Sequence, residues 1–244
     1  MNSSFWGKAC LFYQTYAVYT AHAADGASDA DDARPSAGAS DRSVALSCAG
    51  VSVGPLRDID LALRAGTVTA ITGESGTGKS LLLETLAGLR ACDAGTVAVA
   101  DGRTVALAVQ ESEASLFCEF VADDVAYGPQ NAGLAGAALV ERVRSSMDRV
   151  ALPFDEFADR RTFSLSGGER RKAALAGIVA MNADIVLLDE PTSALDARSR
   201  AQFLSLILAL RDEGKTVVFT TNRLEECDFA DAVVSLDDRA GSSN

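Results

Sequence analysis

A glycine-rich run that begins at residue 73 carries the residue types needed to bind phosphate. Its glycines allow successive backbone N–H groups to converge on one anion, and a helix start adds the positive end of a dipole. Lys79 suits contacts to the β and γ phosphates of a nucleotide, and Ser80 suits Mg²⁺. The alternative is a glycine-rich turn without a ligand. The run consists of Gly73, Glu74, Ser75, Gly76, Thr77, Gly78, Lys79 and Ser80.

Two adjacent carboxylates, Asp189 and Glu190, follow the apolar run Ile185–Leu188. Such a run indicates a strand buried on both faces, and α/β sheets bind ligands at the carboxyl ends of their strands. We therefore expect Asp189 to hold Mg²⁺ through its shell, and Glu190 to orient and deprotonate a water that attacks a γ phosphate. An acidic pair after a strand often only begins a loop, but the phosphate loop favours the catalytic interpretation.

The elements that position these residues alternate between strand and helix, which predicts an α/β core. The run 67–72 is a short strand that leads into the glycine-rich loop, and the helix pattern begins at Lys79. Asp101-Gly102, between two Val-rich runs, predicts a tight hairpin turn. Helical signals dominate from 113 to 179, which predicts a second lobe. The expected strands are 44–53, 59–63, 67–72, 185–188 and 216–220, and the clearest expected helices are 79–89, 137–150 and 169–181.

Composition excludes several classes of protein. A chain of 244 residues that is 48% hydrophobic can bury one substantial core. Its formal net charge of −12 argues against nucleic acid as a partner, because such binders need clustered Lys and Arg. The five cysteines include no CxxC pair, which fits a reducing cytosol. No apolar run reaches the roughly 18 residues of a membrane span, so we expect any membrane association to come through a partner.

The two ends of the chain differ in composition from its centre. We expect residues 1–43 to form a disordered N-terminal extension, 44–238 to form one ATPase domain and 239–244 to form a short tail. Residues 5–24 faintly resemble a secretory signal, but Gln14 and Thr15 interrupt its apolar region. A start codon assigned too far upstream would give the same picture.

The segment Leu165-Ser166-Gly167-Gly168-Glu169 lies one helix before the strand that ends at Asp189. It resembles the signature of ABC ATPases, and Gln110 and the run 193–196 match the Q-loop and D-loop of that family in the expected order. The resemblance spans roughly residues 44–238. It implies a P-loop NTPase fold with a RecA-like core, a small antiparallel β subdomain and an inserted α-helical subdomain at about 113–179.

The same resemblance implies ATP and Mg²⁺ as ligands and assigns further roles. Gln110 would contact the metal and take part in catalysis. Ser166, Gly167 and Gly168 would offer hydroxyl and N–H donors to the nucleotide of an opposite subunit, because a helix N-terminus binds anions. The expected assembly is therefore a head-to-tail pair with a second ABC ATPase subunit, either a homodimer or a heterodimer.

A narrower resemblance follows the Q-loop. Ser115-Leu116-Phe117, Asp124 to Asn131 and Ala174 to Met181 are similar to the ATPases of energy-coupling-factor importers for vitamins or metal ions. An amphipathic helix with a Gly-Pro turn is the alternative. The resemblance implies an integral membrane coupling subunit, a substrate-binding membrane subunit and a peripheral position at the cytoplasmic face of the cell membrane. It does not identify the substrate.

Position 222 departs from the family pattern. Asn222 stands where the family has its switch histidine, and the chain's one histidine, His22, lies far away in the sequence. The residues 51–53, where an aromatic usually stacks on adenine, include none, and Ser112 and Ser115 replace the usual Pro and Gln. Two alternatives stay open: a degenerate nucleotide-binding subunit with a structural or regulatory role, and an ABC protein without a membrane partner.

Overall fold

A six-stranded sheet forms the centre of the computed structural model, which describes residues 16–20, 43–109, 116–193 and 195–237. The strand order is β1-β6-β7-β8-β4-β9. Neighbouring strands from β6 to β9 run parallel, and β1 pairs antiparallel with β6 at one edge. These strands are β1 (Tyr16–Thr20), β4 (Val68–Thr72), β6 (Thr104–Ala108), β7 (Ile185–Leu188), β8 (Thr216–Thr221) and β9 (Ala232–Ser235).

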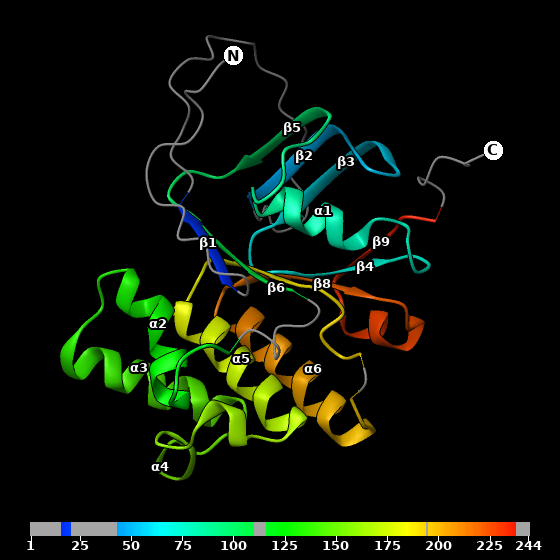
Figure 1. Ribbon diagram of the computed structural model, residues 1–244. Coiled ribbons are helices and arrows are strands. Elements are labelled where there is room, and N and C mark those ends of the chain that lie inside the picture. The colour runs from blue at the N-terminus through cyan, green and yellow to red at the C-terminus, as the bar shows by residue number, and fades with distance from the viewer. Residues whose placement is uncertain (1–15, 21–42, 110–115, 194, 238–244) are drawn as a thin grey trace.

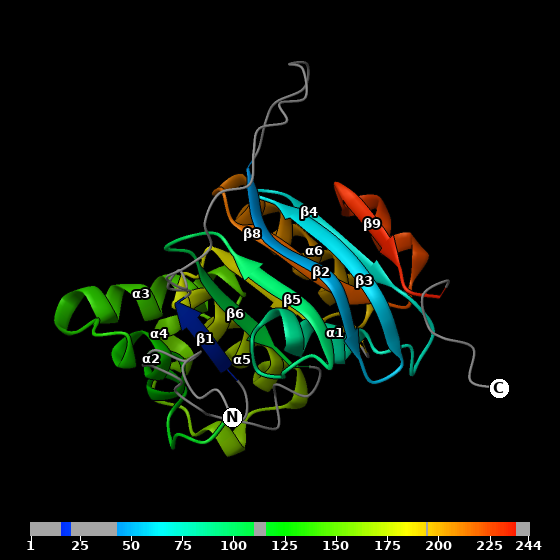
Figure 2. The same cartoon turned by 90° about the horizontal axis from the view of Figure 1, so that it is seen from above.

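A second, three-stranded antiparallel sheet has the order β3-β2-β5, with β2 at Val44–Val53, β3 at Leu56–Arg64 and β5 at Ala94–Val99. Gly95 allows β5 to approach β2 closely. A Cβ at this position would lie 2.4 Å from backbone atoms of Gly50, and the Gly95 φ of 85° is left-handed. Figure 2 shows this small sheet lying over one face of the large sheet.

Helix α1 (Lys79–Leu86) lies between the two sheets (Figure 1). Its buried leucines, Leu82, Leu83 and Leu86, belong to one apolar cluster with residues of both sheets, among them Leu56 and Val218. Burying a leucine side chain stabilises a fold by about 1.5–3 kcal/mol. This cluster therefore fixes the start of α1, and with it the glycine-rich loop, against the large sheet.

The opposite face of the large sheet is covered by helices (Figure 1). A second apolar cluster joins Val186, Leu188 and Phe219 of the sheet to α5 and α6, and α2 and α3 pack on α5. Gly128 of α2 permits a close approach, because a Cβ there would lie 1.9 Å from the sulfur of Met181. The helices are α2 (Val121–Asn131), α3 (Gly136–Arg149), α4 (Phe154–Phe157), η2 (Thr162–Ser164), α5 (Gly167–Met181), α6 (Ala197–Asp212) and η3 (Leu224–Phe229).

The α/β class and the predicted strands and helices are confirmed, with shifts of a few residues at their ends. The hairpin prediction at Asp101-Gly102 is wrong: the chain does turn there, with the Arg103 N–H donating to the Ala100 carbonyl at 3.1 Å, but β5 and β6 join different sheets. Within the predicted disordered extension, residues 16–20 instead form β1. The division into 1–43, 44–238 and 239–244 stays a prediction.

Candidate functional site

The glycine-rich loop joins β4 to α1 at the carboxyl end of the large sheet. Gly76 and Gly78 have left-handed φ values of 89° and 99°, which residues other than glycine adopt only at a cost in free energy. A Cβ on Gly76 would meet nothing within 4 Å, whereas one on Gly78 would approach Leu56 to 3.0 Å. The loop is also tied down from the far edge of the sheet, since the Glu74 N–H donates to Asp237 at 2.8 Å. The result is a fixed backbone arch that is open to solvent at Gly76.

Lys79 occupies the inside of this arch and is only 5% exposed. Its Nζ donates to the carbonyls of Gly73 at 2.7 Å and Glu74 at 3.0 Å, and lies 3.5 Å from Oε1 of Glu190. The ammonium thus joins the loop to the carboxylate at the end of β7. Ser80, the next residue, is exposed and leaves its hydroxyl available to a ligand.

Asp189 and Glu190 leave the end of β7 beside this lysine. Asp189 is 6% exposed, and its Oδ1 accepts a hydrogen bond from the Thr220 hydroxyl at 2.8 Å. Glu190 has a left-handed φ of 42°, and its N–H donates to the same hydroxyl at 2.7 Å. The structure thus brings Lys79, Asp189 and Glu190 together as the sequence predicts, and adds Thr220, which no sequence pattern indicates.

The donor set fits Mg²⁺. This ion prefers oxygen ligands and is held in proteins by one or two carboxylates together with phosphates and waters. Within the described part of the chain, no three His, Cys, Asp or Glu residues cluster as a metal site made of protein ligands alone. At Asp189, Oδ1 accepts the Thr220 hydrogen bond, and Oδ2 has no hydrogen-bond partner among the described residues. Asp189 can therefore offer one carboxylate oxygen, and Ser80 one hydroxyl, to a metal that also contacts phosphate.

The predicted signature residues begin α5 at a different part of the surface. Ser166 is the N-cap: its hydroxyl accepts from the Glu169 N–H at 3.3 Å, and Glu169 in turn accepts from the Ser166 N–H at 2.7 Å. This bond lowers the pKa of the Glu169 carboxyl. Gly167 and Gly168 are exposed, and a Cβ on either would meet nothing within 4 Å. The first turn of α5 is therefore exposed, and among the described residues no hydrogen bond joins it to the phosphate loop of its own chain.

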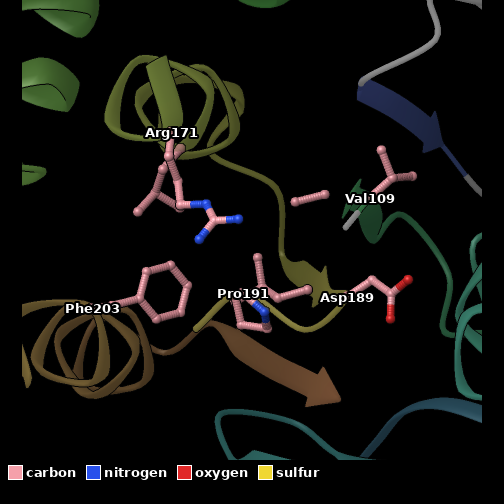
Figure 3. Close-up of a pocket in the computed structure, with 8 residues that line it drawn as sticks. Val109, Arg171, Asp189, Pro191 and Phe203 are labelled. Atoms are coloured by element: carbon pink, nitrogen blue, oxygen red, sulfur yellow. The ribbon is translucent and has the colours of Figure 1, made fainter. Parts of the chain in front are cut away.

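A small pocket separates α5 and α6 from the end of β7. Figure 3 shows Arg171 and Phe203 facing it beside Pro191, while the Asp189 side chain points away from them. Arg171 also donates a hydrogen bond from Nη1 to the Ser193 carbonyl. This hydrogen bond joins the signature helix α5 to the segment that follows Glu190.

The predicted residues Gln110 and Asn222 differ in whether the structure describes them. Gln110 lies outside the described residues, as do Ser112, Ser115 and Ala194. Asn222 directly follows β8 and is exposed. Because β8 neighbours β7 in the sheet, Asn222 emerges at the same edge as Asp189 and Glu190.

A family model described as ABC transporter matches residues 56–193, which include the phosphate loop, the signature and the carboxylate pair. This chain belongs to the ABC transporter family. Members of the family bind ATP with Mg²⁺ and hydrolyse it.

Relatives of this ABC protein include ATP-binding proteins of energy-coupling factor transporters. The energy-coupling factor transporter ATP-binding protein EcfA2 of Lactococcus lactis subsp. cremoris is 37% identical over 198 residues, 75% of this chain and 68% of that protein. The predicted resemblance to ABC ATPases of energy-coupling-factor transporters is therefore confirmed.

Solved structures agree with the ABC fold. The chain matches an inward-facing metal-chelate type ABC transporter with a TM-score of 0.69 and 28% identity, covering 80% of each chain. CbiO1 of Clostridium perfringens, part of the ABC transporter complex CbiONQ, matches with a TM-score of 0.70 over 79% of this chain and 84% of that one. Its 24% identity supports the fold alone.

Proposed function

We propose that this chain binds and hydrolyses Mg-ATP as a motor subunit of an energy-coupling-factor importer for a vitamin or a metal ion. The observation that carries the proposal is the junction of Lys79, Asp189 and Glu190 at one edge of the sheet, where Lys79 lies 3.5 Å from Glu190. Phosphate binding and water activation are thereby combined in one place. The identity shared with EcfA2 supports the importer class.

In the proposed mechanism, the backbone of residues 73–78 and the Lys79 ammonium bind the phosphates. A triphosphate competes with Glu190 for this ammonium, and the Glu190 carboxylate, once separated from Lys79, orients the attacking water and accepts its proton. Ser80, Asp189 and Gln110 would hold Mg²⁺, which supplies neutralisation of charge on the phosphate oxygens when bound.

The exposed signature supports the second part of the proposal, a paired assembly. Gly167 and Gly168 are exposed at a helix N-terminus, and the Ser166 hydroxyl, which donates to Glu169 in this structure, is exposed beside them. We infer that they complete the site of a second ABC ATPase subunit, as the family resemblance implies.

The membrane partners follow from the importer class. We infer an integral membrane coupling subunit and a substrate-binding membrane subunit, with this chain peripheral at the cytoplasmic face. Among the described residues, no helix is both long enough and apolar enough to cross a bilayer.

Asn222 motivates an asymmetric pair. An asparagine side chain can donate amide hydrogen bonds to a phosphate, but unlike histidine it never carries a positive charge. We propose that ATP binding at this chain's own site survives while hydrolysis there is slowed, and that this chain prefers a heterodimer in which its signature serves a partner's site.

The test is reconstitution with an integral membrane coupling protein, a substrate-binding membrane protein and a second ABC ATPase from the same genome. We expect the four chains to purify together, and ATP to drive uptake of a metal ion or vitamin into proteoliposomes in a form that Lys79→Ala abolishes. A chain that purifies without membrane proteins and hydrolyses ATP equally well alone would contradict the transport role. A stable homodimer that ignores the second cassette would contradict the heterodimer.

A further inference from the structure

The Thr220 hydroxyl lies between the two carboxylate residues at the end of β7. It donates to Oδ1 of Asp189 at 2.8 Å and accepts from the N–H of Glu190 at 2.7 Å. Thr220 is fully buried on β8, next to Phe219, which pairs with Leu188 across the two strands. The Thr220 hydroxyl therefore contacts both Asp189, the proposed metal ligand, and Glu190, the proposed catalytic carboxylate.

We propose that Thr220 is a positioning residue for ATP hydrolysis, which sets the orientation of the Asp189 carboxylate and the backbone of Glu190 together. The proposal rests on the function proposed above. Thr220 touches neither nucleotide nor metal in this account, and acts only through its two neighbours.

The first consequence concerns the metal ligand. Because the Thr220 hydrogen is used on Oδ1, rotation of the Asp189 carboxylate is restricted and Oδ2 is left to face a metal shell. Such hydrogen bonds to ligating carboxylates orient the ligand, and removing them typically costs about 10–100-fold in metal affinity or activity.

The second consequence concerns the catalytic carboxylate. Glu190 has a φ of 42°, a conformation that a residue other than glycine adopts only when its surroundings hold it. Its N–H bond to Thr220 is one such restraint. Without this bond the peptide can relax toward ordinary φ values, which would move the side chain away from the phosphate loop.

A second threonine on β8 provides a matched control. Thr216 is also fully buried, and its hydroxyl also accepts a backbone N–H, that of Gly66 at 3.1 Å. It lies at the opposite end of the strand, away from Asp189 and Glu190. Thr220→Val and Thr216→Val each remove one buried hydroxyl at nearly constant volume, so a merely structural role predicts the same result for both.

The experiment compares wild type, Thr220→Val, Thr220→Ser and Thr216→Val. In the nucleotide-free chain, hydrogen exchange at the Glu190 amide should accelerate by about 2–10-fold in Thr220→Val alone, because this variant removes the hydroxyl that accepts the Glu190 N–H. The gain in ATP affinity on adding Mg²⁺ should fall about 10–100-fold in Thr220→Val, while affinity for ATP without Mg²⁺ stays unchanged. Thr220→Ser should restore wild-type behaviour in both measurements.

Single-turnover hydrolysis in the assembled complex gives the third measurement, in which Thr220→Val should be about 10–100-fold slower than Thr216→Val. Equal exchange, Mg²⁺ dependence and turnover in the two valine variants would overturn the proposal. If Thr220→Val fails to fold, Thr220→Ala and Thr216→Ala replace the pair under the same criteria. A wild-type complex that hydrolyses no ATP would contradict the proposed function instead, and the exchange and Mg²⁺ measurements would still decide the role of Thr220.

Discussion

The phosphate loop and the signature both use the N-terminus of a helix, but the structure treats them differently. At the phosphate loop, Lys79 is 5% exposed and is held by two carbonyls and a carboxylate. At the signature, Ser166, Gly167 and Gly168 are exposed, and the capping hydrogen bonds are confined to the first turn of α5. Lys79 at the first helix start is buried within a network, although residues 74–76 and Ser80 beside it are exposed, whereas the start of the second helix is exposed without such a buried side chain.

This difference indicates which groups are complete within one chain. The phosphate loop is held by Asp237 at Glu74 and by Glu190 at Lys79, and Glu190 is held in turn by Thr220. In the proposed pair, the signature residues serve a second nucleotide, a role that needs access to solvent and a rigid base, and the capping box provides that base. Substitutions at the phosphate site or at the signature alone should therefore have different effects, the largest of which is expected at Glu190.

The largest effect is expected from Glu190→Gln on the phosphate side. The amide cannot accept the proton of the attacking water, so single-turnover hydrolysis at this site should fall by about 10²–10⁴-fold. ATP affinity should not fall, because Glu190 binds no phosphate in the proposed mechanism. Unchanged turnover in rapid-quench measurements would remove Glu190 from the catalytic role.

On the signature side, Gly168→Asp should lower hydrolysis by the assembled pair by about 10²–10³-fold, the typical cost of losing an oxyanion donor. An acidic residue is tolerated in the first turn of a helix, so the fold should survive. Ala137→Asp is the matched control, since Ala137 is also the second residue of an exposed helix. Equal effects of the two substitutions on steady-state ATPase would contradict a special role for the signature.

Asn222→His should increase hydrolysis at this chain's own site by about 10²-fold, the lower range for a positioned acid-base group. The gain requires Glu190, so the double variant with Glu190→Gln should show none. Single-turnover assays with the partner's site inactivated would measure this. Should Asn222→His change nothing while Glu190→Gln alone abolishes hydrolysis, the site is not impaired by its asparagine and the proposed asymmetry is wrong.

The smallest effect concerns the capping box. Glu169→Gln should lower the free energy of unfolding at pH 7 by about 0.3–1 kcal/mol, as expected for a charge lost near a helix N-terminus. The Ser166 N–H holds the pKa of this carboxyl below its usual value, so the stabilisation is present above about pH 4.3. It disappears as the pH falls through the folded-state pKa. Urea titrations at several pH values should show the two proteins converging in acid.

Local patterns were sufficient to predict much of this site. The loop at 73–80 and the pair at 189–190 are short runs whose spacing specifies their chemistry, and both follow strands that the sequence also indicates. Thr220 could not be found in this way, because it acts across two strands on residues some 30 positions away, and a threonine in a strand is ordinary. The hairpin prediction was wrong for a similar reason. Asp101-Gly102 specifies a turn, but it does not specify which sheet the next strand joins.

We propose that the isolated chain binds nucleotide through its phosphate loop, and that its signature contributes to binding only when a second ABC ATPase subunit is present. Isothermal titration of Mg-ATP into the isolated chain tests this most directly, using wild type, Lys79→Ala and Gly168→Ala. The account predicts that Lys79→Ala weakens binding by about 1.5–3 kcal/mol, the value of a hydrogen bond to a charged group, whereas Gly168→Ala changes nothing. Equal affinity of wild type and Lys79→Ala, or equal losses in both variants, would contradict it.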